Sequence, residues 1–137
     1  EYIQKNIHTF HDVFVANPNY FDFGDKEISF EELKAHPLMM LSRNSTTNEF
    51  LHNIFIQHQL ELVPDIELNS NDLLIDLARI GLGIAFVPDY CVDANDPDLT
   101  IISTKEKLPT RQMVVSVNTA FPVSTSTEEF LNILPTA

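Results

Sequence analysis

The chain has 137 residues, of which 44% are hydrophobic and 20% are charged, and its formal net charge is −12. This length suits one domain or a pair of small lobes, and the composition excludes wholesale disorder. The negative charge disfavours DNA, RNA and anionic membrane surfaces as partners. The single cysteine, Cys91, excludes an intramolecular disulfide framework and a zinc site built from several cysteines.

The start of the chain, from Glu1 to Lys5, lacks the basic residues and the apolar stretch of a signal peptide. No run of about 18 apolar residues follows, so the sequence predicts no membrane-spanning helix. We therefore expect a cytoplasmic protein that needs no membrane. Because the first residue is not Met, we also expect this chain to be a piece of a longer one.

The first expected element is a strand at residues 9–16, rich in Phe and Val and stopped by the turn residues at 17–19. Ser29 and Glu32 then form a capping box, in which each side chain can satisfy a backbone N–H group of the other residue. A short helix should follow it and end before Pro37.

The apolar run at residues 38–41 has the length of a strand, and its continuity favours a strand buried on both faces, as in a parallel sheet. Residues 46–49 form a second capping box with Thr46 as the cap. The helix that it opens carries apolar residues at helical spacing and should end near Gln59.

A third strand and helix are expected next. The strand covers residues 65–68, and Ser70 offers the N-cap of the helix. An apolar stripe runs through residues 73–80, and Gly81 can end the helix in the left-handed conformation. The buried-type strand at 83–87 follows directly.

The last part of the chain predicts two further strands, at residues 99–103 and 112–117. Pro88 stands where a new helix can begin. A third capping box at residues 126–129 predicts a final helix, which Pro135 ends.

The middle of the chain thus alternates strand, helix, strand, helix, strand, a pattern that implies parallel strands with right-handed crossovers. In such sheets ligands bind beyond the carboxyl ends of the strands. The junctions at residues 43–47 and 69–71 should therefore share one end of the sheet. Their free helix N–H groups favour an anion such as a carboxylate, and Arg43 can add a charged contact. The alternative is that Thr46 and Ser70 only cap their helices.

The residues give less support to a catalytic site or a metal site. Ser45 or Thr46 would need a base and an orienting group to act as a nucleophile, and the Gly-x-Ser-x-Gly elbow is missing. Glu49 and His52 share a helix face and could form half of a metal site, but a second such pair is absent, which favours a solvated face. We therefore expect no enzyme activity, no metal and no cofactor.

One long segment resembles a known family, the effector-binding domains of LysR-type transcriptional regulators. It reads Ile66-Glu67-Leu68-Asn69-Ser70-Asn71-Asp72-Leu73-Leu74 and continues as Ala78-Arg79-Ile80-Gly81-Leu82-Gly83-Ile84-Ala85-Phe86-Val87-Pro88. The segments at 13–18, 29–41 and 130–131 are similar to the family in type and order, so that the resemblance covers nearly the whole chain.

The resemblance implies a fold like that of periplasmic binding proteins, in which two crossing strands join two α/β lobes with a mostly parallel sheet. A small effector would bind between the lobes, an N-terminal winged helix-turn-helix would bind DNA, and the protein would form dimers or tetramers. By position, the residues that face the effector would be Ser45, Thr46, Asn69 and Ser70, with Arg43 as a weaker candidate.

The chain departs from the complete family pattern, because it has no helix-turn-helix and lacks about half of the first lobe. Residues 1–15 would be a crossing strand with part of the first lobe, residues 16–112 the second lobe, and residues 113–137 the return strand with a C-terminal helix. A cleft that lacks one wall buries less of its ligand, so we expect weak or absent effector binding by this chain alone. The exposed apolar edges favour self-association.

Three functions remain open at this point. The first is the sensing domain of a transcription regulator, with a small effector such as a carboxylate as its ligand. The second is a solute-binding protein of a transport system, which would need an export signal. The third is a small enzyme, which would need a base and a nucleophile close together.

Overall fold

The computed structural model describes the backbone of residues 2–118 and the side chains of residues 8–114. The chain divides into two compact units, one formed by residues 12–108 and the other by residues 1–11 together with residues 109–137. The helix expected after the capping box at 126–129 lies outside the described residues.

The larger unit is built on a five-stranded sheet of β2 (Asp12–Ala16), β3 (Leu38–Leu41), β4 (Ile66–Leu68), β5 (Ile84–Pro88) and β6 (Thr100–Ile102), in the order β4-β3-β5-β2-β6. β3 is parallel to both β4 and β5, while β2 is antiparallel to β5 and β6. The sheet is therefore mostly parallel with β2 reversed, which confirms the expected α/β class.

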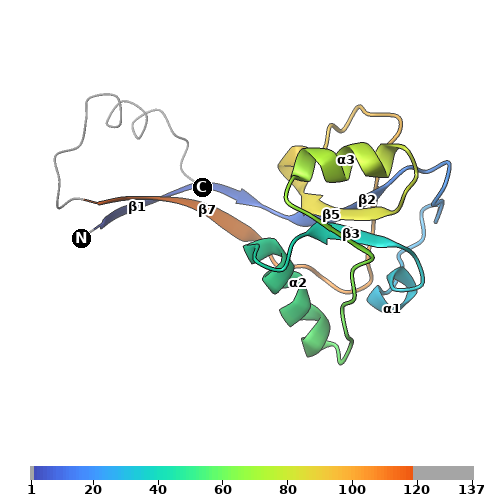
Figure 1. Cartoon of the computed structure of the whole chain (residues 1–137), viewed down its shortest axis with the longest axis horizontal. Helices are drawn as coiled ribbons and strands as arrows, with labels where there is room; N and C mark the ends of the chain where they lie inside the picture. The colour runs from blue at the N-terminus through green and yellow to red at the C-terminus, as the bar shows by residue number, and fades with distance from the viewer. Residues whose placement is uncertain (1, 119–137) are drawn as a thin grey trace. The chain divides into compact units, whose positions relative to one another are not determined.

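Helices cover both faces of this sheet (Figure 1). α3 (Asn71–Arg79) lies on one face, and α1 (Phe30–Leu33) and α2 (Thr46–Gln57) lie on the other. Neighbouring residues of β3 show why both faces are buried: Met39 packs in the cluster of α3, whereas Met40 packs in the cluster of α1 and α2. The residues of β3 are all apolar because helices cover both faces of the sheet and bury both sides of the strand.

Two boundaries differ from the expectation. The strand predicted at 9–16 is interrupted at His11, so that β1 (Tyr2–Phe10) and β2 belong to different units. The second helix is capped by Ser45, whose hydroxyl accepts a hydrogen bond from the backbone N–H of Asn48 at 3.1 Å, and Thr46 is its first helical residue. The reason is the turn after β3, in which the N–H of Ser45 donates to the carbonyl of Ser42 at 2.9 Å.

The other helix boundaries agree with the sequence. Ser29 and Ser70 cap α1 and α3 by accepting from the N–H groups of Glu32 and Leu73. Gly81 follows α3 with a φ of +83°, the left-handed conformation expected there. The strands expected near β3, β4, β5 and β6 are present, and Pro88 precedes a short 3-10 helix, Asp89–Cys91.

The smaller unit contains a two-stranded antiparallel ribbon of β1 and β7 (Arg111–Asn118). Its register runs from Tyr2 opposite Asn118 to Phe10 opposite Arg111, with an irregularity between Asn6 and His8. The guanidinium of Arg111 lies 5.2 Å from the centre of the buried Phe10 ring, a cation–π contact that supports this end of the ribbon.

Candidate functional site

The candidate site is the edge of the sheet where β3 and β4 end. Leu41 is paired in parallel with Leu68, and the N–H of Ser42 donates to the carbonyl of Leu68 at 2.9 Å. The polar residues that follow each strand therefore begin at the same edge. Ser45 and Ser70, the N-caps of α2 and α3, both belong to this edge, as the sequence predicted.

The two serine hydroxyls are arranged alike. Each oxygen accepts a hydrogen bond from the N–H three residues further along, at 3.1 Å for Ser45 and 3.2 Å for Ser70. Within the described part of the chain, neither hydroxyl donates its proton to another group of the protein. Each serine thus caps its helix and keeps one O–H donor, beside the positive end of a helix dipole.

The other predicted residues take different positions. Thr46 begins α2 and is exposed, and Asn69 is exposed between β4 and the cap Ser70. The side chain of Arg43 is 80% exposed, and its Nε lies 3.5 Å from Oε1 of Glu67 on β4. Arg43 therefore joins the two strand ends with a surface ion pair, and its positive charge is partly compensated.

Sequence reasoning missed the role of Asn48. This residue is buried in the first turn of α2, and its side-chain Nδ2 donates to the carbonyl of Leu41 at 2.8 Å. The bond fixes the start of α2 to the last residue of β3. The signal in the sequence is an amide three residues after the Ser45 cap, where a capping box would have Glu or Gln.

Asn71, the first residue of α3, has a side-chain oxygen that is buried and accepts no hydrogen bond. Leaving a buried acceptor unpaired costs about 1–3 kcal/mol. The Asn71 oxygen is therefore an unpaired acceptor that protein atoms enclose at the start of α3.

Acidic side chains surround Cys91, which follows β5. Burial raises the pKa of the Cys91 thiol, and the negative charges of Asp72, Asp89 and Asp12 raise it further. Asp72 lies in the first turn of α3, Asp89 follows β5, and the buried Asp12 begins β2 opposite Pro88. The edge of the sheet therefore combines helix N-termini with carboxylates, a setting for a ligand that carries both an anionic group and hydrogen-bond donors.

In the residues that the structure describes, no group of three or more His, Cys, Asp or Glu side chains is placed to hold a metal ion, and Glu49 with His52 remains a single pair. Among the described helices, none combines the length and the apolar character that crossing a bilayer requires.

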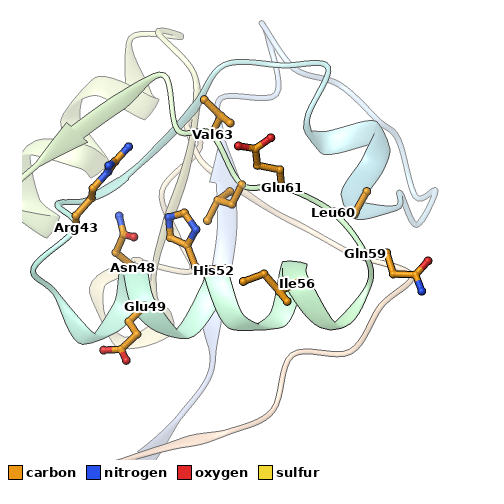
Figure 2. Close-up of a pocket in the computed structure, with 10 residues that line it drawn as sticks. Arg43, Asn48, Glu49, His52, Ile56, Gln59, Leu60, Glu61 and Val63 are labelled. Atoms are coloured by element: carbon orange, nitrogen blue, oxygen red, sulfur yellow. The ribbon is translucent and has the colours of Figure 1, made fainter.

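A second feature of the larger unit is a groove of about 860 Å³, here called the α2 groove (Figure 2). It lies between the outward face of α2 and the segment that leads from α2 towards β4. Of the five residues predicted to bind an effector, only Arg43 lines it. The lining residues are Arg43, Asn48, Glu49, His52, Ile56, Gln59, Leu60, Glu61, Leu62 and Val63.

Several proteins of known sequence or structure are similar to this chain. A probable RuBisCO transcriptional regulator of Thalassiosira pseudonana is 34% identical over 71 residues, which are 50% of this chain and 23% of that protein. The regulatory domain of Synechocystis PCC6803 CcmR, solved in complex with 2-PG, superposes with a TM-score of 0.82 at 21% identity. The effector binding domain of QuiR, solved in complex with shikimate, superposes with a TM-score of 0.76 at 12% identity.

These superpositions cover 98% of this chain and 65% of the CcmR chain, and 96% of this chain and 62% of the QuiR chain. The chain thus spans less than two thirds of either solved domain and about a quarter of the curated relative. The match in fold confirms the expected likeness to periplasmic binding proteins, which LysR regulatory domains share.

The whole described part of the chain also falls within one family match. The family described as the LysR substrate binding domain matches residues 2–137. This result favours the regulator over the transport protein that the sequence left as an alternative. The chain belongs to the LysR substrate binding domain family.

Proposed function

We propose that this chain is the sensing domain of a LysR-type regulator and that it binds a small effector at the carboxyl edge of β3 and β4. The observation that carries the proposal is the parallel pairing of these strands, which brings the caps Ser45 and Ser70 to one edge. Ser45, Thr46, Asn69 and Ser70 are the proposed contacts, and Arg43 supports them from its ion pair with Glu67.

The chemistry of the edge supports an oxygen-rich acid as the effector. The N–H groups at the starts of α2 and α3 attract an anionic group. The carboxylate of Asp72, in the first turn of α3, instead accepts hydrogen bonds from hydroxyl or ammonium groups of the same molecule. The ligands of the solved relatives, 2-PG and shikimate, are also small acids.

In the proposed mechanism, residues 12–108 form one lobe, and the strands β1 and β7 connect it to the other lobe. The effector shifts the population towards a closed arrangement of the lobes, and this arrangement changes how an oligomer presents DNA-binding domains encoded outside these residues. The domain acts in the cytoplasm and catalyses no reaction. Its role is to change conformation in response to the concentration of the effector.

A thermal-shift screen of small carboxylates, hydroxy acids and amino acids tests this function, with the complete gene product and this chain measured in parallel. A ligand present at about 100 times its dissociation constant stabilises the folded state by about 2.7 kcal/mol. We expect a hit with the complete protein, a smaller shift with this chain, and loss of both shifts in Ser70→Ala. A hit that persists in Ser70→Ala and in Ser45→Ala would contradict the proposed site.

A further inference from the structure

The α2 groove has an apolar floor and two exposed apolar edges. Ile56 on α2 is 66% exposed and Val63 on the facing segment is 64% exposed, although both are large apolar side chains. Leu62 also lines the groove and is buried. Figure 2 shows His52 and Ile56 on α2 and Val63 on the segment opposite. The groove is thus a surface where a further apolar group can be buried with little rearrangement.

The segment opposite α2 has the properties of an unpaired strand edge. Exposure alternates along it, with Glu61 and Val63 exposed and Leu62 buried. Hydrogen bonds hold both ends, since the N–H of Leu60 donates to Phe55 at 2.9 Å and the N–H of Asp65 donates to Leu38 at 2.8 Å.

Between these two ends the backbone lacks partners. In the part of the chain that the structure describes, the N–H and C=O groups of Glu61, Leu62 and Val63 make no hydrogen bond with other backbone groups. A row of fixed, unpaired backbone groups is a template on which an extended chain can add as a further strand.

The charges around the groove determine which side chains it accepts. Glu49 and Glu61 line it, while the positive charge of Arg43 is shared with Glu67. The chain as a whole carries a formal charge of −12. A basic segment therefore gains from both the local carboxylates and the overall field.

We propose that the α2 groove binds an extended segment of another protein in which apolar and basic side chains alternate. Its backbone pairs with Glu61–Val63, its apolar side chains pack on Ile56 and Val63, and a Lys or Arg side chain meets Glu61. This contact shares Arg43 with the proposed effector residues but depends on Glu61–Val63, so it can be tested whether or not an effector binds at the edge.

The test uses the full 137-residue chain labelled with ¹⁵N and a short capped peptide of alternating lysine and valine. Two matched peptides serve as controls: one has glutamate in place of lysine, and the other is methylated on the backbone nitrogens of its pairing edge. We expect saturable shifts of the amide signals of Glu61–Val63 with the lysine peptide, and weak or absent shifts with both controls.

Two variants separate the charge from other effects. Glu61→Lys should weaken binding of the lysine peptide about fivefold, in keeping with the strength of exposed ion pairs. Glu27→Lys makes the same change at an exposed site away from the groove and should leave binding unchanged apart from the general field.

Several results would overturn the proposal. These are no saturable binding of the lysine peptide, equal binding of the glutamate or methylated peptide, or equal affinity in Glu61→Lys. The amide signals of Glu61–Val63 could instead shift with the protein concentration and not with the peptide concentration. That result would show that a second copy of the chain occupies the groove.

Discussion

Ser45 and Ser70 have the same structural role, because each is the N-cap of a helix that follows one of two adjacent parallel strands. The pairing of Leu41 with Leu68 fixes both junctions at one edge of the sheet. The same two hydroxyls therefore serve the fold and the proposed effector site. The contributions of each serine to stability and to effector binding must therefore be measured separately.

Replacing either cap should lower stability. Ser45→Ala and Ser70→Ala each remove a hydrogen bond to a helix N–H group and should each reduce the free energy of unfolding by about 1 kcal/mol. Urea denaturation followed by circular dichroism measures this loss.

Ser29→Ala is the matched control, since Ser29 caps α1 on another part of the fold. It should cost a similar amount of stability without changing the response to an effector. Equal loss of the effector response in Ser29→Ala and Ser70→Ala would mean that the caps act only through stability.

Asn71 should behave in the opposite way. Because its buried side-chain oxygen has no donor, Asn71→Ala removes an unpaired acceptor and should leave the free energy of unfolding unchanged or raise it by up to about 1 kcal/mol. The same variant should leave the effector response unchanged, because the buried oxygen is enclosed by protein and does not reach a ligand. A destabilisation of well over 1 kcal/mol would show that the Asn71 side chain is satisfied in the folded protein.

Much of the local structure could be predicted from the sequence. Capping motifs at Ser29 and Ser70 and the glycine at 81 mark helix ends correctly, because these signals depend on a few neighbouring residues. The cap of α2 was placed one residue late, at Thr46. Two adjacent hydroxyl residues offer the same local chemistry, and the choice of Ser45 depends on where β3 ends.

Contacts between distant residues were beyond the reach of sequence patterns. The carboxylate of Glu106 accepts from the N–H of Phe30, 76 residues away, with both oxygens at 3.0 Å. The link from Asn48 to Leu41 and the α2 groove likewise depend on how elements pack. The candidate edge was predictable because parallel strands impose it, whereas the unpaired oxygen of Asn71 appears only in three dimensions.

Gly81 should tolerate no side chain. Its φ of +83° disfavours any L-residue, and an added Cβ would overlap the ring of Tyr20. Gly81→Ala should therefore cost about 1–3 kcal/mol in thermal or urea unfolding.

Gly24→Ala provides the comparison, because Gly24 has a φ of +61° but open space around it. It should cost only the backbone strain, about 1 kcal/mol. Adding Tyr20→Ala to Gly81→Ala should restore the part of the unfolding free energy that is lost through overlap with the Tyr20 ring. Equal costs at the two glycines would argue against a close approach of Tyr20.

The ion pair of Arg79 and Asp96 should give stability a defined dependence on pH. A hydrogen bond from Arg79, at 2.6 Å, holds the pKa of Asp96 below its ordinary value of 3.8, and a second bond from the N–H of Asp98 acts in the same direction. A depressed pKa in the folded state means that this contribution is complete above the ordinary value and is lost as pH falls through the lowered one.

The difference in unfolding free energy between the natural chain and Asp96→Asn should therefore be constant above about pH 5 and should shrink in more acidic solution. Denaturation at a series of pH values measures it. Asp98→Asn changes an exposed neighbour for which no salt bridge is found among the described residues, and serves as the control. A difference that stays constant down to the lowest accessible pH would exclude this pair as the cause.

The most direct test of the account is an amide-shift titration of the ¹⁵N-labelled chain with small acids, beginning with 2-PG and shikimate. Shift changes detect weak binding, which we expect of a chain that spans less than two thirds of the solved domains it matches. We expect an effector to shift the amide signals of Ser45–Asn48 and Ser70–Leu73 together, and Ser70→Ala to reduce both sets of shifts. An acid that binds this chain without shifting either set would contradict it.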